Sequence, residues 1–346
     1  MLCSQFVGSM THHRQLSARF CDAVLTMVLL ILVSGCQGDG GVSENDDGTT
    51  DVRIALNWYP EAEHGGFYAA ETAGYFQQQN LAVELIPGGP AAPTTVISEM
   101  AANRILFAVS DADNVVKARA AGVPIVAVLA PMQQSPRCIM VHKSSGITSL
   151  QDLQNVDLAI SEGRPFALWM KKRLPLTNVN LVPFGGGVGE FLVNDRYAQQ
   201  GFVFSEPYTA EKQGGDPLPL MVSDTGFNPY ASVLITTESA IRERPELVRR
   251  VVTACVQGWQ QYLKDPEQTN QLIHSCNEEM SLETLAYGAQ ALVPLCTSDG
   301  QTASCRMTLQ RWQELVSQIE ELGVTEAGEV KPEECFTNDF LPVNSD

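Results

Sequence analysis

Side chains able to bind a small ligand are concentrated after the first apolar segment that follows the N-terminal region, where residues 56–70 read LNWYPEAEHGGFYAA. Trp58 and Tyr59 offer flat faces for stacking, and packing over the core is the alternative use of Trp58. His64 offers a hydrogen bond to a ligand or to the helix that follows. Gly65, at the expected start of that helix, offers a backbone N–H that suits an anion or a carbonyl oxygen. Together these residue types predict one side of a ligand site.

A second group of candidates lies near the ends of later apolar segments. Ser110 and Asp111 close a predicted strand, where they would contact a ligand or cap the next helix. Glu206 can accept two hydrogen bonds from an exocyclic amine and a ring N–H, unless it is an exposed turn acid. Three aromatic residues could supply further ring faces: Phe166, Tyr208 and Tyr230. A flat heteroaromatic ligand needs this combination of aromatic faces and a polar edge.

One glycine-rich loop offers additional backbone donors. Gly185 and Gly186 open the sequence GGGVG (residues 185–189) before a helical pattern. This loop lacks the Lys-Ser/Thr ending of a nucleotide P-loop and the full dinucleotide-binding pattern, so we expect no such cofactor. The chain also lacks GxSxG and HExxH motifs, so a hydrolase is not indicated. No CxxC or HxxxH spacing supports a metal site.

The N-terminal region has the features of an export signal. Two arginines precede the uncharged apolar run AVLTMVLLILV (residues 23–33), which is short for a membrane span. Small residues stand directly before Cys36, as in a bacterial lipoprotein signal. We therefore expect residues 1–35 to be removed and Cys36 to carry lipid, with an uncleaved anchor helix or an ordinary secretory signal as alternatives. Residues 36–50 are polar and predict a flexible tether.

The charge balance argues against a nucleic-acid partner. The chain has 22 basic and 40 acidic residues, for a net charge of −18, and such a chain repels nucleic acid and anionic lipid. Beyond the signal, an even number of cysteines in an exported protein permits disulfides. Their pairing stays open, and metal binding is the alternative interpretation. The cysteines concerned are Cys138, Cys255, Cys276, Cys296, Cys305 and Cys335.

Apolar runs between turn residues alternate with helical patterns, which predicts an α/β fold with mostly parallel strands. The expected strands cover residues 52–58, 83–89, 105–111, 125–130, 138–143, 156–161, 178–184, 202–207 and 232–237. We expect the C-terminal part to be nearly all helical. In one helix that begins at Pro245, apolar residues recur at helical spacing and should face a core. They are Leu247, Val251, Cys255, Trp259 and Tyr262.

Two separate sets of strands indicate two lobes. We expect lobe I to comprise residues 51–133 and 228–346, and lobe II to comprise residues 134–227. The chain would cross between them near residues 131–137 and 222–230. Clefts between such lobes are preferred sites for small ligands, and hinge closure around them is a known motion.

The segment VRIALNWYPEAEHGGFYAAETAGYFQQQNLAVELIPGG resembles the opening of periplasmic substrate-binding proteins of ABC importers. More narrowly, it resembles the family that binds pyrimidine precursors of thiamine and that includes the eukaryotic thiamine-pyrimidine synthases. FVFSEPY and the helix after Pro245 are similar to later segments of the same family. The resemblance covers nearly the whole chain after the signal. It implies a type II periplasmic binding-protein fold, with two α/β lobes, a ligand cleft and two hinge crossings.

The same resemblance implies a role and partners. The chain is expected to be an exported, lipid-anchored monomer that binds a small heteroaromatic solute and delivers it to ABC permease and ATPase subunits. Ser205 replaces the usual asparagine before Glu206, so the identical ligand is in doubt. Other solutes are therefore alternatives: a riboflavin precursor, a sulfonate such as taurine, or nitrate.

A synthase is the alternative from another functional class. In the eukaryotic synthases of this family, the histidine that matches His64 is consumed as the source of the pyrimidine. Those enzymes carry a late cluster of cysteines that is missing from this sequence. We therefore expect a binding protein and assign no catalytic residue.

Overall fold

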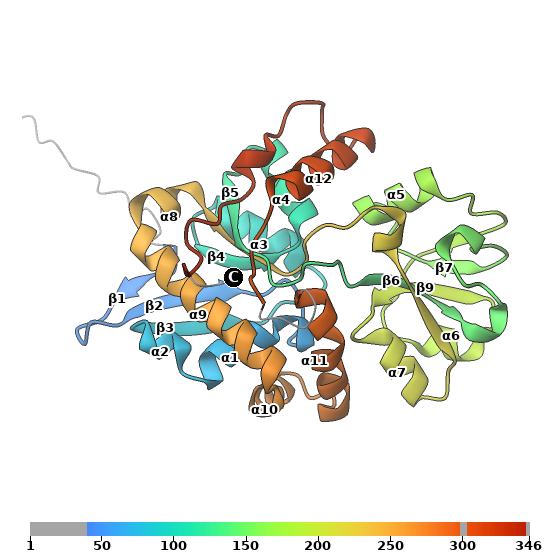
Figure 1. The fold of residues 1–346 in the computed structure, drawn as a ribbon, viewed down its shortest axis with the longest axis horizontal. Coiled ribbons are helices and arrows are strands. Elements are labelled where there is room, and N and C mark those ends of the chain that lie inside the picture. Colours follow the sequence, from blue (N-terminus) through green and yellow to red (C-terminus); the bar gives the residue numbers. More distant parts are fainter. Residues whose placement is uncertain (1–39, 298–302, 344–346) are drawn as a thin grey trace, which may run out of the picture. The chain divides into compact units, whose positions relative to one another are not determined.

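The structure is a computed structural model that describes residues 40–297 and 303–343. Gln37–Asp346 form one compact unit, and its described part contains the two sheets seen in Figure 1. The expected signal, residues 1–35, and the expected lipidation site, Cys36, lie outside the described residues. Within the described ranges, no helix is both long and apolar enough to cross a bilayer.

The first sheet is mixed rather than mostly parallel. Its strands are β1 (Ser43–Glu44), β2 (Thr50–Ala55), β3 (Leu81–Ile86), β4 (Phe107–Ser110), β5 (Ile125–Leu129) and β11 (Val233–Thr237). They are ordered β1-β2-β4-β11-β5, with β3 also paired to β2. β2 is parallel to β3 and β4, whereas β11 is antiparallel to both of its neighbours. The late strand thus returns to the first sheet as expected, but it enters in the opposite direction.

The second sheet is also mixed. Its strands are β6 (Arg137–His142), β7 (Asp157–Ala159), β8 (Asn180–Val182), β9 (Tyr197–Phe202) and β10 (Pro217–Met221). Their order is β10-β6-β9-β7-β8. β7 is parallel to β8 and β9, and β6 is antiparallel to β9 and β10. The expected strand at residues 202–207 is wrong: the strand ends at Phe202, and a helix begins at Glu206.

Helices connect and cover the sheets (Figure 1). In the first half they are α1 (Gly65–Thr72), α2 (Tyr75–Gln78), α3 (Ala92–Ala101), α4 (Ala112–Ala120), α5 (Pro165–Arg173), α6 (Gly189–Val193) and α7 (Glu206–Lys212). In the C-terminal part they are α8 (Glu238–Glu243), α9 (Pro245–Lys264), α10 (Glu267–Cys276), α11 (Leu282–Cys296) and α12 (Leu309–Glu321). Short 3-10 turns are η1 (Ala62–His64), η2 (Lys143–Ser145), η3 (Leu150–Asp152), η4 (Val222–Thr225) and η5 (Pro332–Glu334). The helical character expected of the C-terminal part is confirmed.

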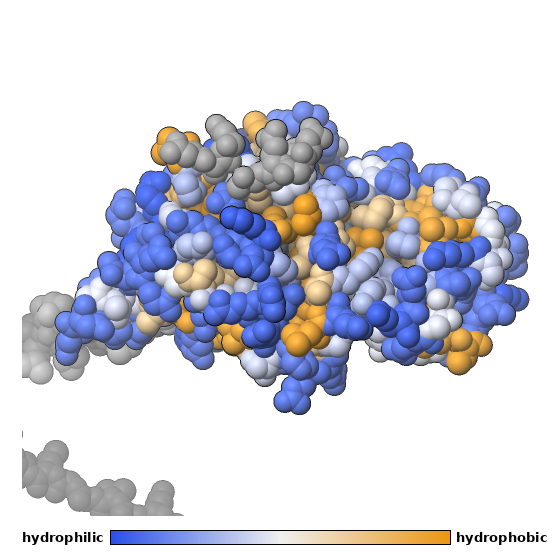
Figure 2. Space-filling view, turned by 60° about the horizontal axis from the view of Figure 1, so that its bottom comes forward, coloured by the Kyte–Doolittle hydropathy of each residue, from blue (hydrophilic) through white to orange (hydrophobic). Residues whose placement is uncertain are grey.

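The strands of the first sheet separate two apolar cores. Alternate residues of a strand point to opposite faces, so Ile54 joins the core that contains α1 and α9. Its neighbour Ala55 joins the core that contains α4 and α12. On the face shown in Figure 2, hydrophilic side chains cover most of the surface, as expected when large apolar residues fill the interior.

The contact between α1 and α9 depends on two glycines. Gly66 lies against the ring of Trp259, and a Cβ on Gly258 would clash with the carbonyl oxygen of Gly66. Trp259 is fully buried and meets Phe67 edge-to-face at 5.8 Å. The expected apolar stripe of this helix is confirmed, because all five of its members are buried. Trp259 therefore packs in the core. Its contacts hold α1, the helix that follows the first ligand-binding candidates in the chain.

Two further expectations differ from the structure. The folded part begins before Asp51, because β1 pairs with β2 and Val42 is 4% exposed in the core. The tether expected over residues 36–50 is therefore partly folded. The six cysteines after Cys36 are all free thiols, so the expected disulfides are absent from the described residues.

Candidate functional site

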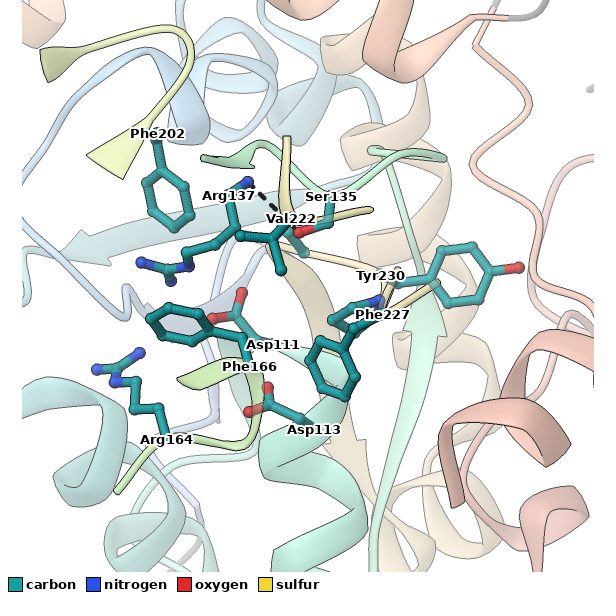
Figure 3. Close-up of a pocket in the computed structure, with 12 residues that line it drawn as sticks. Asp111, Asp113, Ser135, Arg137, Arg164, Phe166, Phe202, Val222, Phe227 and Tyr230 are labelled. Carbon is teal, nitrogen blue, oxygen red and sulfur yellow. Dashed lines mark hydrogen bonds between the residues drawn. The ribbon is translucent and has the colours of Figure 1, made fainter. Parts of the chain in front are cut away.

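A small pocket is lined by residues at the ends of strands from both sheets and by residues in the segments that connect the elements. Its walls come from the segment after β4, the first residue of β6, the start of α5, the end of β9 and the connection before β11. The lining residues are Asp111, Asp113, Ser135, Arg137, Arg164, Phe166, Phe202, Val222, Phe227, Pro229, Tyr230 and Ala231. Figure 3 shows the charged and aromatic side chains converging there. The open space is about 30 Å³, enough for one or two water molecules.

Arg137 occupies the centre of this pocket. Its guanidinium carbon lies 4.1 Å from the centre of the Phe202 ring and 4.8 Å from that of the Phe166 ring. In Figure 3 one ring is above the guanidinium and the other below it. We call the space between these two rings the aromatic slot. Both contacts are cation–π interactions, which are strongest where water is excluded.

Asp111 directs its carboxylate into the pocket instead of capping α4. It is the N-terminal flanking residue of that helix, yet its side chain makes no capping hydrogen bond. Its Oδ1 accepts a hydrogen bond from the backbone N–H of Ser232 at 3.2 Å. Burial and the neighbouring Asp113 raise the pKa of Asp111, while Arg137 and Arg164 oppose that rise. The capping alternative is therefore wrong for this side chain, and contact with a ligand stays a prediction.

Glu206 lies beside the pocket at the first residue of α7. Its Oε2 accepts a hydrogen bond from the backbone N–H of Phe202 at 2.7 Å, so this carboxylate fixes the end of β9 and the ring that closes the aromatic slot. Burial raises the pKa of Glu206, and this hydrogen bond and Arg137 lower it in part. Glu206 is therefore not an exposed turn acid.

Two more carboxylates from the opening motif lie near Glu206. Glu61 and Glu63 are 6% and 1% exposed, and their Oε2 atoms accept hydrogen bonds from Ser205 Oγ at 3.5 Å and Ser232 Oγ at 3.3 Å. Burial, with the neighbouring carboxylates, raises the pKa of Glu61 well above its usual value. Burial also raises the pKa of Glu63 to about 8. These carboxyl groups lie outside the pocket lining, and each is harder to ionise than an exposed glutamate.

His64 and Gly65 serve the fold in this structure. His64 is fully buried, and its Nε2 lies 2.9 Å from Asn57 Oδ1. Burial lowers the pKa of His64 to about 3, so the imidazole is neutral. The N–H of Gly65 donates to the carbonyl of Ala62, and a Cβ on Gly65 would clash with the Tyr262 ring. The expectation that Gly65 offers a free N–H is therefore wrong, because the helix start already satisfies it.

The aromatic candidates divide between pocket and packing. Phe166 lines the pocket. Tyr230 lines it by its backbone, whereas its ring points away (Figure 3) and its hydroxyl accepts a hydrogen bond from the Thr308 N–H at 3.0 Å. Tyr208 is outside the lining and stacks on Tyr287 at 4.3 Å. All three proposed rings therefore have a partner within the protein, and among them only Phe166 presents its ring to the pocket.

The remaining candidates also lie outside the pocket lining. The rings of Trp58 and Tyr59 meet edge-to-face at 5.5 Å, and Tyr59 is 48% exposed. Ser110 is fully buried beneath the pocket and accepts a hydrogen bond from Asn114 at 3.4 Å. Gly185 and Gly186 are exposed in the loop before α6, with open space around them. Whether these residues contact a ligand stays a prediction.

Arg137 and Phe202 are the important pocket residues that are not among the sequence candidates. Arg137 stands directly before the apolar run CIMVHK. A strand that begins in the interior rarely carries an unpaired charge, so this position could have indicated a functional residue. Phe202 was missed because the predicted strand began at this residue and ran to 207. In the structure Phe202 is the last residue of β9, so its side chain stands at a strand end. Within the described ranges, no group of three or more His, Cys, Asp or Glu side chains is placed to hold a metal ion.

Comparison with known proteins places the chain in a family. Residues 61–269, more than half of the chain, match the family described as NMT1/THI5 like. The chain belongs to the NMT1/THI5-like family. Its relatives in sequence include a formylaminopyrimidine-binding protein from Halalkalibacterium halodurans, 24% identical over 74% of this chain and 79% of the relative. The riboflavin-binding protein RibY of Chloroflexus aurantiacus is 23% identical over 85% of this chain and 87% of that protein.

An enzyme is also found among the relatives of this NMT1/THI5-like chain. The 4-amino-5-hydroxymethyl-2-methylpyrimidine phosphate synthase of Legionella pneumophila is 23% identical over 68% of this chain and 76% of the enzyme. Among solved structures, a putative periplasmic sulfonate-binding protein SsuA from Methylobacillus flagellatus KT has a TM-score of 0.63 at 16% identity, covering 84% and 92% of the two chains. The predicted periplasmic binding-protein fold is confirmed by this likeness, which shows the fold alone.

Proposed function

We propose that this NMT1/THI5-like protein is the solute-binding lipoprotein of an ABC importer, and that it binds a pyrimidine-type thiamine precursor in the pocket. One observation carries the proposal. The aromatic slot holds a flat group, the guanidinium of Arg137, between two phenyl rings, with the carboxylates of Asp111 and Glu206 nearby. An aminopyrimidine presents the same combination of two π faces and N–H donors at its edge.

Charge supports this class of solute over an anion. Burial raises the pKa values of Glu61, Glu63, Asp111 and Glu206, and neighbouring carboxylates raise those of Glu61, Glu63 and Asp111 further. An anionic ligand would add to this repulsion between negative charges. A sulfonate or nitrate binder remains the second candidate, because Arg137 and Arg164 both line the pocket. Its support is weaker, since one of these two guanidinium groups is already enclosed by aromatic rings.

The proposal does not include catalysis. A synthase that consumed His64 would have to expose this residue, which is fully buried and outside the pocket lining. Its neutral imidazole is held by Asn57. The relatives that are named as binding proteins cover more of the chain than the synthase does. We infer that reversible binding is the activity.

Binding of a pyrimidine requires the pocket to open, because its present volume of about 30 Å³ does not admit one. We propose that residues 51–133 and 228–346 form one lobe and residues 134–227 the other, and that the crossings near 131–137 and 222–230 act as hinges. Contacts between helices of the two proposed lobes would stabilise a closed arrangement. One is the ion pair between Lys172 on α5 and Glu321 on α12, at 3.1 Å.

A thermal-shift panel tests the proposed function. Purified full-length protein is heated with formylaminopyrimidine, hydroxymethylpyrimidine, thiamine, riboflavin, taurine or nitrate. A ligand at 100 times its Kd stabilises the folded state by about 2.7 kcal/mol, so a binder raises the melting temperature by several degrees. We expect this rise with at least one pyrimidine. A rise with taurine or nitrate alone would support the anion candidate instead.

The proposed export and anchoring are tested separately. Lipidation needs the thiol of Cys36, so the Cys36→Ser variant should move from the membrane fraction to the soluble periplasmic fraction after cell lysis. Cys276→Ser is the matched control, because it removes an exposed thiol far along the chain. Retention of Cys36→Ser in the membrane would indicate an uncleaved anchor helix.

A further inference from the structure

Arg137 is half-buried, and its guanidinium is held in an unusual way. A guanidinium has five N–H donors, yet no oxygen in the described ranges accepts a hydrogen bond from this one. The guanidinium contacts the two phenyl rings of the aromatic slot, and Figure 3 shows it between them. The guanidinium of Arg137 is therefore held in the aromatic slot by its flat faces and its charge, and not by directed hydrogen bonds.

The slot has room for one flat group at a time. The distances of 4.1 and 4.8 Å from the guanidinium carbon to the ring centres leave no layer between Arg137 and either ring. The neighbouring open space of about 30 Å³ holds water but no ring. A ligand that stacks between Phe166 and Phe202 must therefore displace the guanidinium first.

The surroundings select what can replace it. Asp111, Asp113 and Glu206 attract the positive charge of Arg137, and Arg164 repels it. A ligand that lacked positive charge or N–H donors would leave these acidic groups without the electrostatic partner that Arg137 provides. A flat ring with an amidine-like edge, in which a ring nitrogen and an exocyclic amine are bonded to one carbon, supplies the N–H donors, and it supplies the positive charge as well once its ring nitrogen is protonated. An anionic guest supplies neither.

We propose that Arg137 is an internal competitor for the ligand: its guanidinium fills the aromatic slot in the free protein and leaves when a flat ring with an amidine-like edge enters. This inference rests on the proposed pyrimidine-binding function and specifies how the site chooses its ligand. Asp111 and Asp113 lie close enough to attract the guanidinium after it is displaced. The measured affinity is then lowered by the fraction of protein in which the slot is open.

The Arg137→Ala variant tests this competition. Benzamidine, a flat amidinium, serves as a probe that does not depend on the identity of the natural solute. We expect the variant to bind benzamidine and formylaminopyrimidine with a Kd roughly tenfold lower than the wild type does. Arg196→Ala is the matched control, since Arg196 is a 72%-exposed arginine outside the pocket; its Kd values should equal those of the wild type. Unchanged or weaker binding of benzamidine by Arg137→Ala would overturn the proposal.

Proton–nitrogen NMR of the wild type gives an answer even if Arg137→Ala does not fold. The Nε–H signal of Arg137, assigned by its loss in Arg137→Lys, should be shifted upfield by the two rings in the free protein. It should move toward ordinary arginine positions when benzamidine or formylaminopyrimidine saturates the site. A signal that stays shifted in the saturated complex would overturn the competition.

The two proposals fail in different ways. If formylaminopyrimidine binds neither protein but benzamidine binds Arg137→Ala more tightly than the wild type, the proposed solute is wrong and the competition stands. If formylaminopyrimidine binds the wild type and binds Arg137→Ala more weakly, the function stands and Arg137 is a direct ligand contact instead of a competitor.

Discussion

The carboxylate of Glu206 accepts a hydrogen bond from the backbone N–H of Phe202 at 2.7 Å. This bond joins the first residue of α7 to the last residue of β9, four positions earlier. One oxygen of the carboxylate therefore orients the end of β9 and the ring of Phe202, and the proposed function assigns the other to the edge of the ligand. The structural and binding roles of Glu206 can be separated by the choice of substitution.

Glu206→Gln should keep the fold and weaken ligand binding. The amide retains an oxygen that can accept from Phe202, but it loses the charge-assisted bond to a ligand amine, worth about 1.5–3 kcal/mol. We expect an unchanged melting temperature and a Kd for formylaminopyrimidine at least tenfold higher. Glu206→Ala should lower both stability and affinity. Calorimetric titration measures the Kd, and unchanged affinity in Glu206→Gln would remove Glu206 from the binding site.

The stability of the protein should fall in alkali because of Glu63. Its pKa is about 8 in the folded protein against an ordinary value of 4.5, so the folded state holds a proton that the unfolded state has lost. The free energy of unfolding therefore decreases as the pH rises from about 5 through 8. Glu63→Gln should be more stable than the wild type at pH 9 by at least about 2 kcal/mol, with a smaller difference at pH 7.

Urea unfolding at pH 7, 8 and 9 measures this effect. The range lies above the region where His64 matters, since the lowered pKa of that residue destabilises the fold only toward acid. Glu278→Gln removes an exposed carboxyl instead and is the control. Parallel pH curves for the wild type and Glu63→Gln would show that Glu63 is ionised in the folded protein.

The close approach of α1 and α9 should tolerate no side chain at Gly258. A Cβ there would clash with Gly66 O and lie 2.7 Å from Ala70 N, and both are backbone atoms that cannot rotate away. Gly258→Ala should therefore lower the free energy of unfolding by about 3 kcal/mol. Gly163→Ala, at a position with open space, should change it by less than about 1 kcal/mol. Equal urea midpoints for the two variants would contradict this packing.

The stacked pair of Tyr208 and Tyr287 should couple α7 to α11. Their ring centres are 4.3 Å apart, and such pairs contribute about 0.5–1.5 kcal/mol beyond burial. A double-mutant cycle with Tyr208→Leu and Tyr287→Leu, followed by urea unfolding, should give a coupling energy in that range. Strict additivity of the two substitutions would mean that the tyrosines do not interact and that Tyr208 is available to a ligand.

Patterns that depend on periodicity predicted much of the fold. The apolar stripe of α9 and the strands around Ile54, Ala127 and Ile235 follow from spacing alone. Strand direction does not, because it depends on how the connections pass over the sheet. β10 escaped prediction because it contains Pro217 and Pro219, which an edge strand tolerates.

The same limit affected the candidate site. β9 contains Gln199 and Gln200, and polar residues at the centre of a strand suggest a loop. The structure satisfies both side chains with backbone partners, Gly187 O at 3.0 Å and the Ser161 N–H at 2.7 Å. Asp111 and Phe166 were recognisable by type and position. Arg137 stood out as a basic residue before an apolar run, but its place between two rings could not be predicted, because that contact joins segments far apart in the chain.

The central claim is that a flat solute binds in the aromatic slot, and calorimetric titration of three proteins with formylaminopyrimidine tests it most directly. The wild type should bind one equivalent. Phe202→Leu should lose at least about tenfold in affinity, since it removes one face of the slot. Leu282→Ala, which alters an exposed apolar side chain outside the pocket, should bind like the wild type. Unchanged binding in Phe202→Leu would contradict the account.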